Sequence, residues 1–149
     1  MDLNRETRDI DCLDARSYTS LDEMFRLGQE ESDLHRKHRV YLQRVTVIEA
    51  CPDDYETRLT EMYVGALANI RLFAPEAHDL ALMKLGRNSE RDRADVKYLA
   101  KAGHITAERL RDRYEKEMRS YIAVPERRAD PIVELWVEMI QEEQGLSRA

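Results

Sequence analysis

The chain has 149 residues, of which 42% are hydrophobic and 36% are charged, and its formal net charge at pH 7 is −6. This length fits one domain with a core of its own, and the composition excludes an intrinsically disordered chain. The acidic balance argues against a protein that binds duplex DNA through a basic surface, because that binding needs clustered Lys and Arg side chains.

Targeting signals are absent from the sequence as given. The N-terminal segment is charged from its second residue and lacks the apolar core of a signal peptide. No apolar run approaches the length that a membrane-spanning helix needs. Cys12 and Cys51 fit no framework of paired spacings, so we expect reduced thiols. Together these features predict a cytoplasmic protein that does not enter a membrane.

The first half of the chain mixes strand and helix signals. Residues 10–13 predict a short strand, and Ser20 is a suitable start for a helix that runs to about residue 37. Residues 40–49 are rich in β-branched side chains and predict a long strand or hairpin arm. A short helix through residue 61 and a strand over residues 68–73 follow.

After Pro75 the apolar spacing changes to the helical period. Glycines end the first two predicted helices, at Gly86 and Gly103. Helix-start residues precede the later ones: Asn88 or Ser89, then Thr106, then Asp130 followed by Pro131. We therefore expect an α+β fold. A small mixed sheet with packed helices, residues 1–74, is followed by a helical part of the same domain, residues 75–149.

Two helical surfaces have open interpretations. The last predicted helix has a broad apolar face that either packs deeply or meets a partner: Ile132, Val133, Leu135, Trp136, Met139 and Ile140. An exposed apolar face or open sheet edge recruits partners, so we expect a homo-oligomer, most simply a two-fold dimer. Basic residues over 109–119 alternate with acidic ones, which indicates a solvated, ion-paired face, an RNA-facing surface being the alternative.

Asp9 and Asp11 form the first candidate for chemistry. Carboxylates two positions apart on a strand point to the same side, where they repel unless a cation lies between them. Hard divalent metals such as Mg²⁺ take such oxygen ligands and bridge to substrate phosphates. A solvated strand end is the alternative interpretation of the same two residues.

The context of these aspartates resembles a known family. The run Arg5-Glu6-Thr7-Arg8-Asp9-Ile10-Asp11 is similar to the metal-binding strand of the DNA polymerase beta-like nucleotidyltransferases. Residues 78–87, HDLALMKLGR, and 91–96, RDRADV, resemble a pattern of uncharacterised bacterial nucleotidyltransferase-like proteins. Those proteins are relatives of the AbiE-type toxins of abortive-infection and toxin–antitoxin systems. The resemblance extends over about residues 5 to 122.

The resemblance implies a role for each matching residue. Asp9 and Asp11 would hold Mg²⁺, with Glu49 as a third carboxylate, although Asp53 and Asp54 lie close by. Lys84 would contact the nucleotide phosphates as a point charge, and Arg5 and Thr7 would contribute to nucleotide binding. Two further residues would complete the polar site or orient Lys84, the second being the better structural partner: Asp92 and Asp95. Without the resemblance, ordinary ion pairs on a helix surface would explain this second group.

One departure from the family pattern bears on function. Only Met1-Asp2-Leu3-Asn4 precedes Arg5, so the sequence lacks the Gly-Gly or Gly-Ser pair whose backbone N–H groups cradle the nucleotide phosphates. We expect a truncated form, or a protein that has lost this element, with impaired nucleotide binding. The resemblance implies nucleotidyl transfer from a nucleoside triphosphate to a protein or RNA acceptor. The alternative is a non-catalytic relative that works through protein–protein contact.

Overall fold

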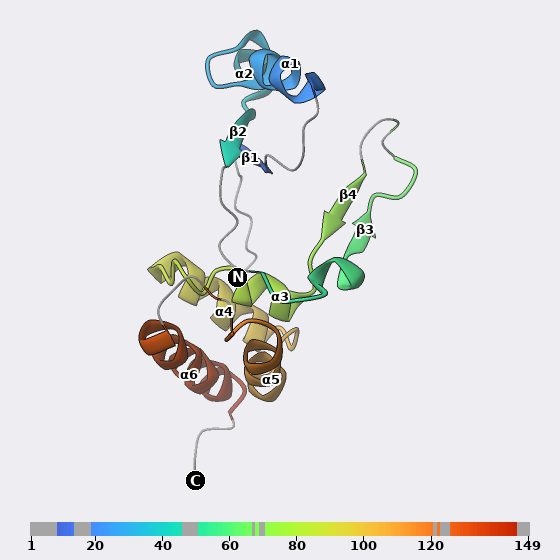
Figure 1. Ribbon diagram of the computed structural model, residues 1–149. Helices are drawn as coiled ribbons and strands as arrows, with labels where there is room; N and C mark the ends of the chain where they lie inside the picture. Colours follow the sequence, from blue (N-terminus) through green and yellow to red (C-terminus); the bar gives the residue numbers. More distant parts are fainter. Residues whose placement is uncertain are drawn as a thin grey trace. The chain divides into compact units, whose positions relative to one another are not determined.

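The structure is a computed structural model that describes residues 9–13, 19–45, 51–66, 68, 71–120, 122 and 126–145. It confirms the predicted α+β class with a helical C-terminal half. The chain divides into two compact units, Met1–Ile48 and Glu49–Ala149. Each unit contains one two-stranded sheet among the described residues, and Figure 1 shows their elements.

The unit Met1–Ile48 is built on two parallel strands, β1 (Asp9–Leu13) and β2 (Tyr41–Val45). Parallel strands need a crossover, and here α1 (Thr19–Gly28) and α2 (Asp33–His38) supply it. Gly28, the last residue of α1, lies so close to β2 that a Cβ there would stand 2.7 Å from Leu42 Cδ1. A glycine is therefore what allows α1 to end against this strand.

The single helix predicted over residues 20–37 is wrong, because the chain turns between α1 and α2. Glu31 adopts a left-handed backbone with φ of 66°. Ser32 then caps α2, since its side chain accepts a hydrogen bond from the backbone N–H of His35. Serine competes for backbone donors in this way and so starts a new helix.

The unit Glu49–Ala149 begins with a 3₁₀ helix, η1 (Tyr55–Arg58), and an antiparallel hairpin, β3 (Thr60–Met62) with β4 (Leu72–Ala74). The sequence placed a helix through residue 61 and so missed β3. Three residues are too few for a periodic signal, and the strand exists because Glu61 pairs with Phe73 across the hairpin.

Four helices follow: α3 (Ala77–Leu82), α4 (Glu90–Lys101), α5 (Ala107–Glu117) and α6 (Glu126–Glu143). Ser89 and Thr106 cap α4 and α5 as predicted. Gly103 has φ of 75°, the left-handed conformation that a glycine accepts after a helix. Within the described residues, no helix is both long enough and apolar enough to cross a membrane.

The predicted start of the last helix at Asp130 and Pro131 is wrong. Helix α6 begins at Glu126 and carries Pro131 in its interior. The Asp130 carboxylate accepts hydrogen bonds from the Tyr114 hydroxyl, at 2.6 Å, and from Arg119, at 2.8 Å. These tertiary contacts hold the residue in the helix instead of leaving it as a cap.

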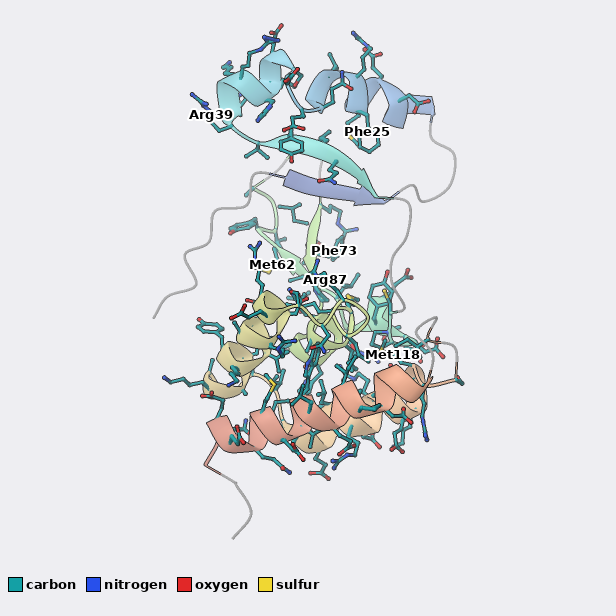
Figure 2. The ribbon with its side chains drawn as sticks, turned by 90° about the vertical axis from the view of Figure 1, so that its left-hand side faces the viewer. Phe25, Arg39, Met62, Phe73, Arg87 and Met118 are labelled. Atoms are coloured by element: carbon teal, nitrogen blue, oxygen red, sulfur yellow. The ribbon has the colours of Figure 1, made fainter. Side chains whose placement is uncertain are left out.

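The core of this unit lies where α6 packs against α4 and α5. Trp136 has no exposed surface, and its Nε1–H donates to Asn88 Oδ1 at 3.0 Å. Met118, labelled in Figure 2, is buried with it. The apolar face of α6 therefore packs within its own chain, although Leu135 stays exposed. Of the two interpretations that the sequence left open for this face, deep packing is confirmed, and the homo-oligomer stays a prediction.

Candidate functional site

Strand β1 carries the two aspartates that the sequence singled out. Asp9 and Asp11 are its first and third residues, and they pair in register with Tyr41 and Gln43 of β2. The predicted strand is confirmed, whereas a metal held by both carboxylates stays a prediction. Three other predicted site residues lie outside the described part of the chain: Arg5, Thr7 and Glu49.

Lys84 lies in the turn after α3 and meets two carboxylates of α4. Its Nζ is 3.1 Å from Asp95 Oδ2 and 3.7 Å from Asp92 Oδ1. The lysine side chain is 21% exposed, whereas that of Asp92 is fully enclosed. The structure thus brings together three predicted residues of the downstream motif, which comprises residues 78–87 and 91–96: Lys84, Asp92 and Asp95. Asp95 is the nearer partner of Lys84, in keeping with the pairing that we expected for it.

Asp92 has a second task, which is to start α4. Its Oδ2 accepts hydrogen bonds from the backbone N–H and the hydroxyl of Ser89, at 2.9 and 2.6 Å. The Ser89 hydroxyl in turn accepts from the Asp92 backbone N–H, which completes a capping box. The Arg87 guanidinium donates two further bonds, at 2.8 and 2.6 Å. These bonds from Arg87 hold the pKa of Asp92 well below its usual value, against the opposite effect of burial.

The two predicted halves of the site lie in different units. Strand β1 belongs to Met1–Ile48 and Lys84 belongs to Glu49–Ala149. The approach of Lys84 to the aspartate strand therefore stays a prediction. Among the residues that the structure describes, no group of three or more His, Cys, Asp or Glu side chains is placed to hold a metal.

A buried charged network, which the sequence did not predict, joins η1, α3 and α5. Asp79 has no exposed surface and accepts hydrogen bonds from Arg58, at 2.8 and 3.0 Å, and from Arg113, at 2.9 Å. Arg58 also donates to Glu117 at 2.6 Å, and Arg113 to Glu76. The hydrogen bonds to Asp79 raise the pKa of Arg58, although burial lowers it. In the sequence, the one signal that could have pointed to this network is that Asp79 belongs to the downstream motif.

The interpretation of residues 109–119 as a solvated face is wrong for Arg113, which is buried. It is right for the exposed pairs on either side of that residue. Arg111 pairs with Glu134 of α6, and Lys116 pairs with Asp112 one turn away, both at 2.6 Å. The helix therefore presents exposed ion pairs on one side and a buried guanidinium on the other.

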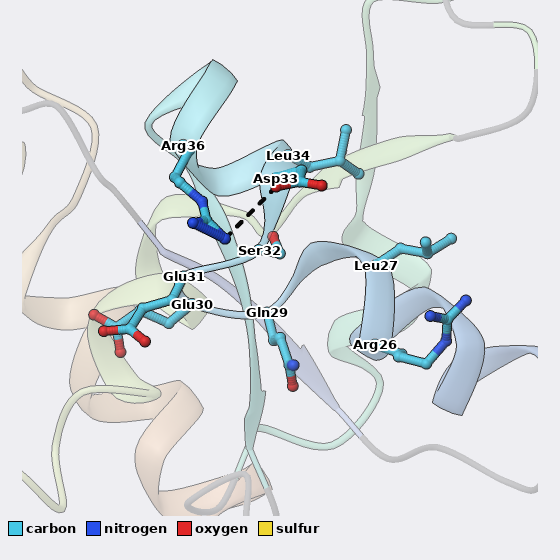
Figure 3. A pocket seen from close by; sticks show the side chains of 9 residues that line it. All are labelled: Arg26, Leu27, Gln29, Glu30, Glu31, Ser32, Asp33, Leu34 and Arg36. Atoms are coloured by element: carbon cyan, nitrogen blue, oxygen red, sulfur yellow. Dashed lines mark ion pairs between the residues drawn. The ribbon is translucent and has the colours of Figure 1, made fainter.

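Two hollows of the unit Met1–Ile48 lie beside α1 and α2 and share Leu27 and Leu34. One, of about 420 Å³, is lined at the turn between the helices by charged side chains, and Figure 3 shows its ion pair between Arg36 and Asp33. The other, of about 300 Å³, is lined almost entirely by apolar side chains. Neither is lined by a predicted site residue.

Comparison with known proteins assigns a family. The family model described as "Nucleotidyltransferase of unknown function (DUF6036)" matches residues 1–144. This range includes β1 and the neighbouring residues Lys84, Asp92 and Asp95. No curated protein and no solved structure matches the chain.

Proposed function

Because this chain belongs to a family of nucleotidyltransferases of unknown function, we propose that it transfers a nucleotidyl group from a nucleoside triphosphate to a protein or RNA acceptor in the cytoplasm. The observation that carries the proposal is the family match, which extends over nearly the whole chain. A relationship to the AbiE-type toxins, and a place in a toxin–antitoxin pair, belong to the same proposal.

Asp9 and Asp11 are the residues proposed to hold Mg²⁺. Their chemistry fits this ion, because two carboxylates on one short strand offer the oxygen ligands that it prefers. Glu49 is the proposed third carboxylate. Bound Mg²⁺ would neutralise charge on the triphosphate. The role proposed for the two aspartates themselves is to hold the metal ion at a fixed place on the sheet.

Lys84 is proposed to contact the nucleotide phosphates. It is partly exposed, and the carboxylate nearest to its ammonium is that of Asp95, at 3.1 Å. Asp92 caps α4 and lies 3.7 Å from the ammonium, so Asp95, the nearer carboxylate, is the residue suited to orient the lysine. The Lys84 ammonium would remain near Asp95 while one of its three donors turns to a phosphate oxygen.

The first experiment tests the metal site. Incubation with Mg²⁺, each nucleoside triphosphate and RNA or protein as the acceptor, followed by measurement of pyrophosphate release, should give a product with the wild type, in a small amount because we expect nucleotide binding to be impaired. Asp11→Asn should abolish it, because one ligand and its charge are lost. Asp33→Asn is the control, since Asp33 is an exposed aspartate of the same unit whose ion pair with Arg36 spans 3.5 Å. Equal activity in all three proteins would place the metal elsewhere.

The second experiment separates binding by Lys84 from its structural role. Lys84→Met should weaken nucleotide binding more than Asp95→Asn does, because the second variant keeps the lysine charge and loses only the carboxylate that orients it. Both variants lose the Lys84–Asp95 ion pair, and Lys84→Met also loses the longer contact with Asp92, so the free energy of unfolding is measured beside each affinity. Equal nucleotide affinities of the two variants would leave Lys84 a structural residue.

A protein that acts by contact alone is the second candidate function, and the β3–β4 hairpin favours it. Tyr63 and Val64 are 69% and 75% exposed at its tip, and Met62 and Phe73, labelled in Figure 2, are exposed on its strands. Its ion pair, Arg71 with Glu61, leaves no net charge between these two residues. Such an apolar, neutral surface suits a protein partner, including a second copy. Sedimentation that shows a monomer with and without Val64→Lys would exclude a homo-oligomer formed through this hairpin.

A further inference from the structure

His78 is a buried titratable group for which the proposed nucleotidyl transfer has no use. It lies in α3, its side chain is 4% exposed, and both ring nitrogens have partners. Nε2 accepts a hydrogen bond from the backbone N–H of Thr106 at 2.9 Å. Nδ1 lies 2.7 Å from Glu76 Oε1.

These partners determine the protonation state of the ring. A backbone N–H can only donate, so Nε2 must carry a lone pair. Nδ1 therefore carries the proton and donates it to the Glu76 carboxylate, which leaves the imidazole neutral. A second proton on Nε2 would face the Thr106 N–H directly, and two donors cannot bond to each other.

The segment that His78 holds is the start of α5. Thr106 is the N-cap of α5, and Ile105 before it has no exposed surface. The same segment is held from the turn after α6, because Gln144 Nε2 donates to the Ile105 carbonyl at 2.8 Å. The start of α5 is therefore held by two hydrogen bonds from other parts of the unit. The acceptor of one of them, the His78 ring, can be protonated.

Charged groups around the ring come from two places. The Glu76 carboxylate favours the protonated ring, whereas Arg113 and Arg109 of α5 oppose it. Helix α4 also packs against α3, and the charged groups that move the pKa of His78 are Glu76, Arg113 and Arg109. Burial, the largest influence, lowers the pKa of His78, and the two arginines act in the same direction.

We infer that His78 is a pH-sensitive lock between α3 and α5. The neutral ring holds the Thr106 amide in place, and protonation releases it. Release loosens the helix that carries Arg113 and Glu117, and with it the charged network around Asp79. The inference does not depend on the proposed nucleotidyl transfer, because it rests on contacts inside the unit Glu49–Ala149, which we call the helical unit.

The sign of the effect follows from linkage. The released ring has an ordinary pKa of about 6.5, above that of the buried ring, so the open form binds more protons. Opening should be independent of pH well above this value. Below it, the opening equilibrium should rise by up to about tenfold for each unit of pH, until the pKa of the buried ring is reached.

Amide hydrogen exchange of the full chain from pH 8 to pH 5, expressed as protection relative to an unstructured peptide, tests the lock. Thr106 should lose protection below about pH 6.5, while Val96 in α4 keeps its own. In His78→Gln an amide oxygen replaces Nε2 as acceptor, so protection should no longer depend on pH. His104→Gln changes an exposed histidine near the same segment and should behave as the wild type.

Gln144→Leu is the matched control, because it removes the hydrogen bond from Gln144 to the Ile105 carbonyl and leaves His78 unchanged. It should lower Thr106 protection at every pH and leave the pH dependence unchanged. If His78→Gln does not fold, an NMR titration of the wild-type ring replaces it, and protonation must coincide with the loss of Thr106 protection. Three results would each overturn the lock. They are Thr106 protection that does not change with pH, an unaltered pH dependence of protection in His78→Gln, and an equal loss of protection at Val96.

Discussion

Replacing Asp92 with asparagine removes a full negative charge from the start of α4 and hardly changes the side-chain shape. The carboxylate has no exposed surface and receives bonds from Arg87 and Ser89. An asparagine oxygen at the Oδ2 position can still accept from Ser89 and from Arg87 Nε. The new amide group would then face Arg87 Nη2, and beyond it the Lys84 ammonium 3.7 Å away.

The expected cost follows from the bond that is lost. A hydrogen bond to a charged group contributes about 1.5–3 kcal/mol, and the facing donors add to that loss. Arg87 is 60% exposed, so water compensates part of its charge and the upper range for a buried ion pair does not apply. We expect Asp92→Asn to lower the free energy of unfolding by about 2–3 kcal/mol.

Trp136 is the natural reporter for this measurement, because it is the single tryptophan of the chain and is fully buried in the same helical unit. Its fluorescence during urea unfolding reports on the core of that unit. Asp112→Asn is the control, since Asp112 is a helical aspartate in an exposed pair with Lys116 and its replacement should lower the free energy of unfolding much less. Equal losses in the two variants would refute the role of the buried cap.

The pH dependence of the same variant has a definite sign. The pKa of Asp92 is lowered from its ordinary value of 3.8. Its carboxylate therefore stabilises the wild type fully above about pH 4, and this stabilisation declines as the pH falls below that value. The difference in stability between wild type and Asp92→Asn should shrink in parallel. A constant difference down to pH 2 would contradict the assignment.

Three further substitutions test other parts of the fold. Gly28→Ala should destabilise the unit of β1 and β2 by about 1–2 kcal/mol, because overpacking against Leu42 outweighs the better helix propensity, and amide exchange of β2 would report it. Pro131→Ala should stabilise the helical unit by about 1 kcal/mol or more, since it restores a donor inside α6, and the urea midpoint by Trp136 fluorescence would rise. Arg58→Met should cost about 2–3 kcal/mol by the same assay, because it leaves the buried Asp79 carboxylate with Arg113 but without two bonds from Arg58.

Local signals determined where α4 and α5 begin. Ser89 and Thr106 start helices because their hydroxyls satisfy backbone donors three residues later, a contact that needs no tertiary partner. The capping pattern of Ser89 with Asp92 was equally readable from sequence, although we assigned Asp92 to the site. The strand of Asp9 and Asp11 and the pairing of Lys84 with Asp95 likewise follow from short motifs, and the family match extends over all of them.

Tertiary structure alone decided which charges are buried. Arg111 and Arg113 stand two residues apart in the same basic run, yet the first pairs with Glu134 in solvent and the second bonds to the enclosed Asp79. Nothing local separates them, because Asp79 lies 34 residues from Arg113 in the chain. The same holds for the apolar face of α6, which only the packing of α4 and α5 could cover. Burial depends on elements that are distant in sequence, whereas a helix cap depends on its nearest neighbours.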